Sequence, residues 1–180
     1  ICGSGLIDAC AKLATAEVME PSGRLRRKKR EELPEKLQER LVDTSDGCHF
    51  VLVEEEDSGR DEPIVITQAD IRQVQLAKSA IFSGIVMLQH VMKISDDDLQ
   101  EVMMCGGFGN YINIESAVKI RLIPNLPLEK ITYSGNAALM GAQMSLLPET
   151  ERDRAYDLSL KMEHVALATR PEFQDIFVDA

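Results

Sequence analysis

A long amphipathic helix is the feature of this sequence that most constrains its fold. Apolar residues recur every three or four positions between Ile71 and Met92, which is the spacing of a helix with one buried face. Thr67, followed three residues later by Asp70, has the pattern of a capping box, so the helix is expected to run from residue 67 to about 91. The chain has 180 residues, enough for one domain with a real core around such a helix, or for two small domains.

A glycine-rich turn comes soon after this helix, at the end of an apolar strand expected at residues 102–105. Its residues are Gly106, Gly107, Phe108, Gly109 and Asn110. A double glycine there lets a flat ligand lie against the backbone, and open α/β sheets bind their ligands at the carboxyl ends of strands. The glycine spacing matches neither the dinucleotide fingerprint nor the P-loop, so those two sites are excluded.

A second glycine-rich turn opens the chain and leads into a helix expected from residue 3 to about 18. Its residues Gly3, Ser4 and Gly5 combine two glycines with a hydroxyl. Backbone N–H groups at a glycine turn can approach a phosphate closely, and the partial positive charge of a helix N-terminus adds to the attraction. A tight turn without a ligand would use the same residues, so the motif alone leaves both interpretations open.

The remaining pattern alternates strands and helices, which predicts an α/β fold. Further helices are expected at residues 33–41, 113–122, 135–147, 149–161 and 171–178, and further strands at 49–53, 63–66, 131–133 and 163–166. The apolar stretches are far shorter than about 20 residues, so no transmembrane span is expected. The chain begins with Ile1 inside a motif, and we therefore expect it to be a fragment.

Charge and cysteine content narrow the classes of partner. The net charge is −10, which argues against general nucleic-acid binding. Residues 21–41 run against this trend, with eight basic and four acidic residues. The basic run 24–30 within them either binds an acidic partner or a phosphate, or forms a solvated loop before the helix expected at residues 33–41. The four cysteines form no CxxC pair, which argues against a zinc or iron–sulfur site in this chain and favours reduced thiols in a cytoplasmic protein.

Polar residues form a second stripe on the long helix. Gln68, Arg72, Gln75 and Ser79 are spaced by four, three and four residues, with Lys78 beside them. Such a stripe either lines a cleft or faces solvent, and its spacing alone fits both.

The order of these segments resembles the second lobe of the acetate and sugar kinase, Hsp70 and actin superfamily of ATPases. Residues 2–5 are similar to the phosphate loop of that superfamily, residues 67–92 to its purine-contacting helix, and residues 103–110 to its adenosine motif. The resemblance implies an α/β, ribonuclease H-like lobe of the actin and Hsp70 type with an inserted small subdomain. The divisions implied are residues 1–18, an insert at 19–66 with the basic loop and a hairpin, and residues 67–180.

More closely, the chain resembles the C-terminal domain of the reductive activators of corrinoid proteins. The similar stretches are residues 1–8, 66–78, 106–112, 135–138 and 168–173. This resemblance implies ATP with Mg²⁺ as ligand and a 2Fe–2S cluster in a preceding ferredoxin-like part. It implies a corrinoid protein or corrinoid-dependent methyltransferase as partner, a reductase as electron donor, and a homodimer. A full-length protein of this kind is an ATPase linked to electron transfer, whereas this stretch alone would not turn over.

The resemblance also assigns site residues, none of them a metal ligand. Those expected to hold the nucleotide are Gly3, Ser4, Gly5, Gly106, Gly107, Phe108, Gly109 and Asn110, with Arg72, Gln75 and Lys78 near the base or ribose. Two other functions stay open. One is activation of another low-potential enzyme such as a 2-hydroxyacyl-CoA dehydratase, although that class places paired cysteines around a shared cluster. The other is an interaction module that keeps the fold without binding nucleotide.

Overall fold

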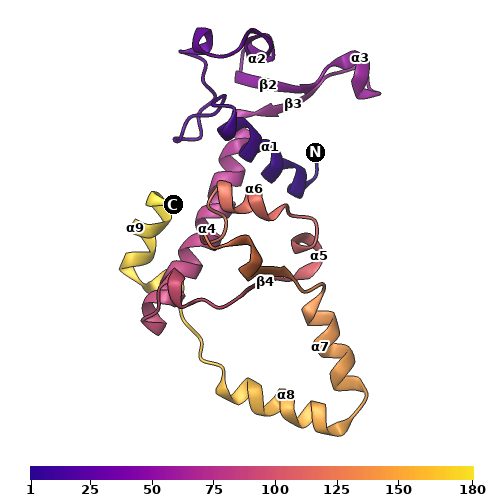
Figure 1. Ribbon diagram of the computed structural model, residues 1–180, viewed down its shortest axis with the longest axis vertical. Coiled ribbons are helices and arrows are strands. Elements are labelled where there is room, and N and C mark those ends of the chain that lie inside the picture. Colours follow the sequence, from indigo (N-terminus) through magenta and orange to yellow (C-terminus); the bar gives the residue numbers. More distant parts are fainter.

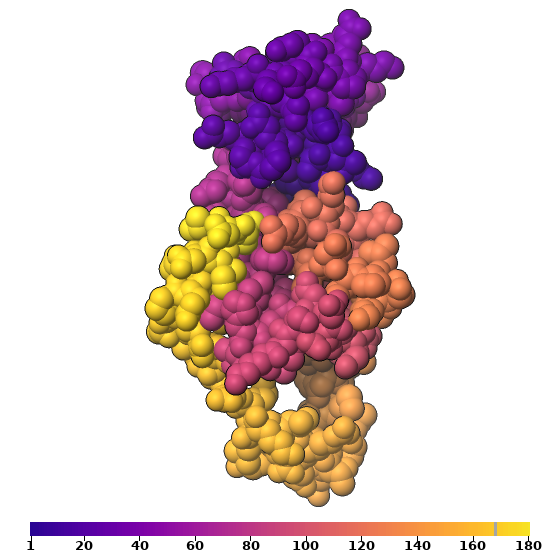
Figure 2. Space-filling model, turned by 60° about the vertical axis from the view of Figure 1, so that its left-hand side comes forward, coloured from indigo at the N-terminus to yellow at the C-terminus, as the bar shows by residue number. Residues whose placement is uncertain are grey.

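The computed structural model describes residues 1–180, except for the side chain of Ala168. Helix α4 (Gln68–Met92) forms the axis of an elongated molecule (Figure 1). Helix α1 (Gly3–Thr15) packs near its N-terminal end, and helix α9 (Pro171–Asp179) lies along its side (Figure 2). The two ends of the chain therefore both pack against this one helix.

The remaining elements are short. The other helices are α2 (Glu35–Glu39), α3 (Glu55–Ser58), α5 (Gly106–Gly109), α6 (Ile114–Lys119), α7 (Ala137–Leu146) and α8 (Glu149–Lys161). The strands are β1 (Leu41–Thr44), β2 (Gly47–Val53), β3 (Ile64–Thr67), β4 (Val102–Met104) and β5 (Ile131–Tyr133). Single 3₁₀ turns lie at Arg30–Glu32, Asp96–Asp98, Leu128–Lys130 and Leu167–Thr169. Among the described residues, no helix combines the length and apolar content needed to span a membrane.

The start of α4 confirms the predicted capping box. The Asp70 backbone N–H donates to Thr67 Oγ1 at 3.0 Å, and the Thr67 backbone N–H donates to Asp70 Oδ2 at 2.9 Å. Each side chain thus satisfies a backbone donor that the first turn of a helix leaves free. The helix ends at Met92, one residue beyond the predicted end.

The face that α4 buries differs from its apolar stripe. Ile71 is buried, but Ile81 and Leu88 are 49% and 45% exposed, whereas the small Ser79 and Ser83 face the interior. A helix of 25 residues is about 37 Å long, so different neighbours cover it along its length. Spacing alone therefore predicted the helix correctly but not the side that it buries beyond its first turns.

A three-stranded antiparallel sheet in the order β1-β2-β3 lies above α1 and α4 (Figure 1). Strands β2 and β3 form the predicted hairpin, with a register shift between Val51 and Val53, and the connection between them contains the short helix α3. Strand β1 was not predicted, because a helix was expected to continue to residue 41. Helix α2 ends at Glu39, and the fully buried Leu41 pairs instead with Phe50 of β2.

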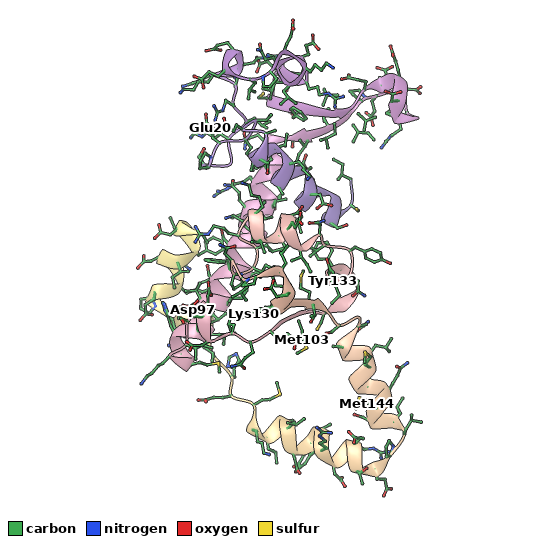
Figure 3. All side chains as sticks on the ribbon, viewed as in Figure 1. Glu20, Asp97, Met103, Lys130, Tyr133 and Met144 are labelled. Carbon is green, nitrogen blue, oxygen red and sulfur yellow. The ribbon has the colours of Figure 1, made fainter. Side chains whose placement is uncertain are left out.

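Strands β4 and β5 form a parallel pair at the other end of α4, with Val102 opposite Ile131. Two polar groups labelled in Figure 3 fix the chain around this pair. The Lys130 ammonium donates to the Leu99 carbonyl at 2.7 Å, and the Tyr133 hydroxyl donates to the Ile112 carbonyl. The predicted strand at residues 163–166 is wrong. This segment is largely exposed and pairs with no described strand, and an extended segment without a partner leaves its backbone to water.

One apolar core runs through all three predicted divisions of the chain. Ile7 belongs to the first division, Leu41 to the second, and Ile71 and Ile131 to the third, and all four lie in the same buried cluster. The boundaries at residues 18 and 66 stay a prediction, but the segments that they separate share one hydrophobic interior.

Replacing Leu41 with alanine should lower the free energy of unfolding by about 2–5 kcal/mol, because it removes a fully buried side chain and leaves a cavity. The neighbouring Val42, which is 41% exposed, is the matched control, and Val42→Ala should cost less than about 1 kcal/mol. Urea denaturation followed by circular dichroism measures both. Equal losses would show that β1 does not pack as described.

Candidate functional site

The first glycine turn forms the N-terminus of α1. Cys2 is the N-cap, and its sulfur accepts a hydrogen bond from the Gly5 N–H at 3.4 Å. The Ser4 hydroxyl lies 3.4 Å from the same sulfur. The first N–H groups of a helix have no partner within it, so those of Gly3 and Ser4 are left without an intrahelical partner at this end of α1. The start of the predicted helix is confirmed, and its end comes at Thr15 rather than near residue 18.

The second glycine turn follows β4 directly, as predicted, and closes into the one-turn helix α5. Gly106 has a φ of 92°, a conformation that favours glycine, and its N–H donates to the Gly135 carbonyl at 2.7 Å. A Cβ added at Gly107 would meet no atom within 4 Å, so one side of this turn is open. The third glycine-containing segment, before α7, therefore supports the second through a backbone hydrogen bond that spacing did not predict.

The two glycine turns meet through one aromatic ring. A Cβ built on Gly3 would lie 2.6 Å from Cε2 and 3.1 Å from Cζ of Phe108, so the ring lies directly against the Gly3 backbone. Helix α5 and the N-terminus accordingly lie on the same side of α4 (Figure 1). We call residues 3–5 and 106–110 the glycine cluster. Eight of the eleven predicted site residues belong to these two turns, which the sequence separates by about 100 positions.

The three predicted site residues on α4 lie elsewhere. Arg72 is exposed, whereas Gln75 and Lys78 line a cavity of about 550 Å³. This cavity is bordered by the C-terminal parts of α1, α6 and α9, and no residue of the glycine cluster lines it. The structure therefore does not bring these α4 side chains into the glycine cluster.

The polar stripe on α4 mainly binds the loop that follows α1. Gln68 accepts from the Leu25 N–H at 3.0 Å and donates to the Gly23 carbonyl at 2.8 Å, and Gln75 donates to the Ser22 carbonyl at 3.1 Å. A Cβ on Gly23 would lie 2.3 Å from the Gln75 amide nitrogen, so glycine is needed for this close approach. A purely solvent-facing stripe is thus excluded for Gln68 and Gln75.

Lys78 is the partly buried cation next to this stripe. Its ammonium donates to the backbone carbonyl of Ala180. Burial lowers the Lys78 pKa, and the nearby positive charge of Arg121 lowers it further. Arg121 itself lies under the Phe82 ring, 4.9 Å from its centroid. Two cations therefore line this cavity: Lys78, held by the carbonyl of Ala180 after α9, and Arg121, held against the ring of Phe82.

The basic segment 24–30 makes mostly internal contacts. Arg26 pairs with Glu32 at 3.2 Å and Arg27 with Asp43 at 2.7 Å, and Arg30 donates to the backbone carbonyls of Gln38 and Leu41. Lys29 also pairs with Glu32. Arg27 and Arg30 thus hold β1 and α2 in place, whereas Arg26 and Lys29 pair within the segment itself. This pattern fits the predicted loop better than a free docking surface.

The cysteines occupy contrasting environments. Burial raises the pKa of the Cys10 thiol to about 11 and also raises the Cys48 pKa. Hydrogen bonds from the Ser4 hydroxyl and then the Gly5 N–H lower the pKa of the exposed Cys2 thiol. Within the described residues, no three His, Cys, Asp or Glu side chains come together as a metal site.

Comparison with known proteins places this geometry in a family. The model of the C-terminal ASKHA domain of RACo matches residues 1–180. The corrinoid activation enzyme RamQ of Eubacterium limosum is 32% identical over 98% of this chain, and a Co(II) methylated amine-specific corrinoid protein reductase of Methanosarcina barkeri is 26% identical over 64%. A solved reductive activator for corrinoid, iron-sulfur protein superposes over 100% of the chain with a TM-score of 0.85 and 36% identity.

The family model and the structural match place the fold in the ASKHA class, named for acetate and sugar kinases, Hsp70 and actin. Within that class, this chain belongs to the family of C-terminal domains of RACo, the reductive activators of corrinoid proteins. The chain spans 30% of the length of RamQ, 22% of the M. barkeri reductase and 28% of the solved activator.

We expect Cys2 to be alkylated by iodoacetamide faster at pH 7 than an ordinary cysteine, because its lowered pKa increases the fraction of reactive thiolate. Ser4→Ala removes the hydrogen bond that contributes most to this lowering, so the pH profile of alkylation should move to higher pH. Peptide mass spectrometry separates Cys2 from Cys10, whose raised pKa and burial should keep it slow. An unchanged profile in Ser4→Ala would contradict the assigned cause.

Proposed function

We propose that this chain is the nucleotide-binding lobe of an ATP-dependent reductive activator, which returns a Co(II) corrinoid protein to the Co(I) state. Membership of the RACo family and the printed names of the relatives support this function. The observation that carries it is the contact between Gly3 and Phe108, which joins the two glycine turns in one place.

The glycine cluster fits the phosphates of ATP. The N–H groups of Gly3 and Ser4 have no partner within α1, and they lie at the end of a helix whose dipole favours an anion. The open side of Gly107 leaves room for a ligand against the backbone. The cluster contains no carboxylate, so Mg²⁺ would be held there by phosphate oxygens and by groups outside these residues.

The base and ribose contacts stay a prediction. Gln75 and Lys78 line a cavity suited in volume to a small ligand, and the apolar Ile71 and Val74 form part of its wall. For Gln75, Lys78 or Arg72 to contact a nucleotide bound in the glycine cluster, the ligand would have to reach around α1 or α4 would have to move.

A 2Fe–2S cluster does not fit the cysteines of this chain. Cys10 and Cys48 are buried and Cys2 and Cys105 exposed, and no metal-binding group forms among the described residues. We therefore assign the cluster to another part of the activator. The reduction adds one electron, supplied by a reductase through that cluster, to Co(II).

The role of this lobe in that transfer is conformational. A ligand shifts a protein between two states only by as much as its affinities for them differ. Residues 3–5 would hold the phosphates and residues 106–110 the adenosine side, so ATP would favour the arrangement in which both turns face one ligand. That arrangement would bind the corrinoid protein, or the corrinoid-dependent methyltransferase that carries it. We further propose a homodimer that acts in the cytoplasm, where the thiols of Cys10 and Cys48 stay reduced.

Gly107→Val should abolish ATP and ADP binding, measured by calorimetry with Mg²⁺, without unfolding the chain. A branched side chain there would fill the space proposed for the ligand but would meet no protein atom at its Cβ, and Gly107 needs no positive φ. Gly141→Val is the matched control, because this glycine of α7 is equally open and lies outside the cluster. Circular dichroism checks that both variants keep their helix content.

The intact activator should show the same loss, together with loss of ATP-dependent reduction of Co(II), followed by the corrinoid absorption spectrum. Unchanged affinity in a folded Gly107→Val variant would overturn the assignment of the site. Absence of binding by both the chain and the intact activator would favour the interaction module instead.

A further inference from the structure

We infer that Phe108 is a gate on the nucleotide site, and that its ring must leave Gly3 before a phosphate can bind the N-terminus of α1. This inference rests on the proposed function. Its structural basis is the position of the ring, which lies so close to Gly3 that any side chain at that position would overlap it. Phe108 is nevertheless 54% exposed and is not part of the core, so the core does not hold the ring in this position.

The ring and a phosphate compete for the same place. Gly3 is the first residue of α1, and an anion bound at a helix N-terminus must approach the N–H groups of its first residues. An aromatic face beside those groups offers no hydrogen bond to a phosphate oxygen and excludes the water that would solvate it. In this position, Phe108 therefore occupies the space beside Gly3 that a phosphate approaching the same turn would need.

The backbone around Phe108 allows the ring to move. It is carried by a four-residue helix whose other members are all glycine. Gly106 is fixed by its hydrogen bond to the Gly135 carbonyl, while the space beside Gly107 is open. A swing about Gly107 would carry the ring away from Gly3 and leave β4 and the Gly106 anchor in place.

The identity of residue 3 follows from the same contact. A methyl group there would be 2.6 Å from a ring carbon, closer than two carbon atoms approach without displacement. Glycine at position 3 thus permits the closed position of the ring, in addition to any approach of a phosphate. The gate predicts that these two residues are energetically coupled even without nucleotide.

The test compares the rate and affinity of ATP binding in the wild-type intact activator and its Phe108→Ala variant, by stopped-flow fluorescence with a labelled ATP analogue and by calorimetry. A site that is open about one tenth of the time binds about tenfold more tightly when the gate is removed, and the gain appears in the association rate. Tyr111→Ala is the matched control, because Tyr111 is a neighbouring exposed aromatic residue outside the cluster, and it should leave both values unchanged.

Equal or weaker binding by Phe108→Ala would overturn the gate, and weaker binding would show instead that the ring stacks on the ligand. If the wild type binds ATP, either result leaves the proposed function intact. If neither protein binds ATP, the proposed function fails and the gate with it.

A second measurement needs no nucleotide. Gly3→Ala should destabilise the wild type in urea denaturation, because the added methyl group displaces the ring, and should be neutral or stabilising in the Phe108→Ala background. Equal effects of Gly3→Ala in the two backgrounds would show that the contact does not hold the gate closed.

Discussion

The junction between β3 and α4 is the constraint on which the rest of the structure depends. Ile66 and Ile71 are almost completely buried on either side of it, and the capping box of Thr67 and Asp70 satisfies the backbone between them. Gln68 then fixes the loop after α1 by two hydrogen bonds. Within six residues the chain thus connects the three-stranded sheet, α4 and the loop that follows α1. The position of the C-terminal end of α1 relative to the start of α4 is fixed in this way.

The glycine cluster depends on this junction without touching it. Helix α1 packs on α4 and on α6, and α6 follows α5 after a short connection, so the two turns converge because their helices share neighbours. The Gly106 N–H is fixed by the Gly135 carbonyl, which lies in the short segment between β5 and α7. Three segments of the sequence therefore meet in one small cluster, in which backbone groups are the fixed parts and Phe108 is an exposed large side chain.

Most of the elements could be predicted from sequence because local signals determine them. The capping box gave the start of α4, and the double glycine gave the turn after β4. Strand β1 could not be predicted, because Leu41 is its single buried residue and no alternation precedes the polar Asp43. The prediction of a strand at residues 163–166 was wrong for a different reason. The local pattern suggested a strand, but a strand also needs a neighbour to pair with, and no local pattern reveals whether one is present. For the site, glycine type and spacing identified both turns, but the contact of Gly3 with Phe108 and the separate location of Gln75 and Lys78 are properties of packing.

The charge balance of the glycine cluster explains why such a lobe would act as a lever and not as a tight nucleotide binder. Residues 3–5 and 106–110 carry no charged side chain, so they offer an anion only backbone dipoles and a hydroxyl. The cations Lys78 and Arg121 line a different cavity. Much of the affinity for a nucleotide would then come from groups beyond this cluster. If those groups contact the nucleotide only in a closed arrangement, ATP would bind the closed arrangement more tightly than the open one. ATP binding would then favour closure, which is what an ATP-dependent switch requires.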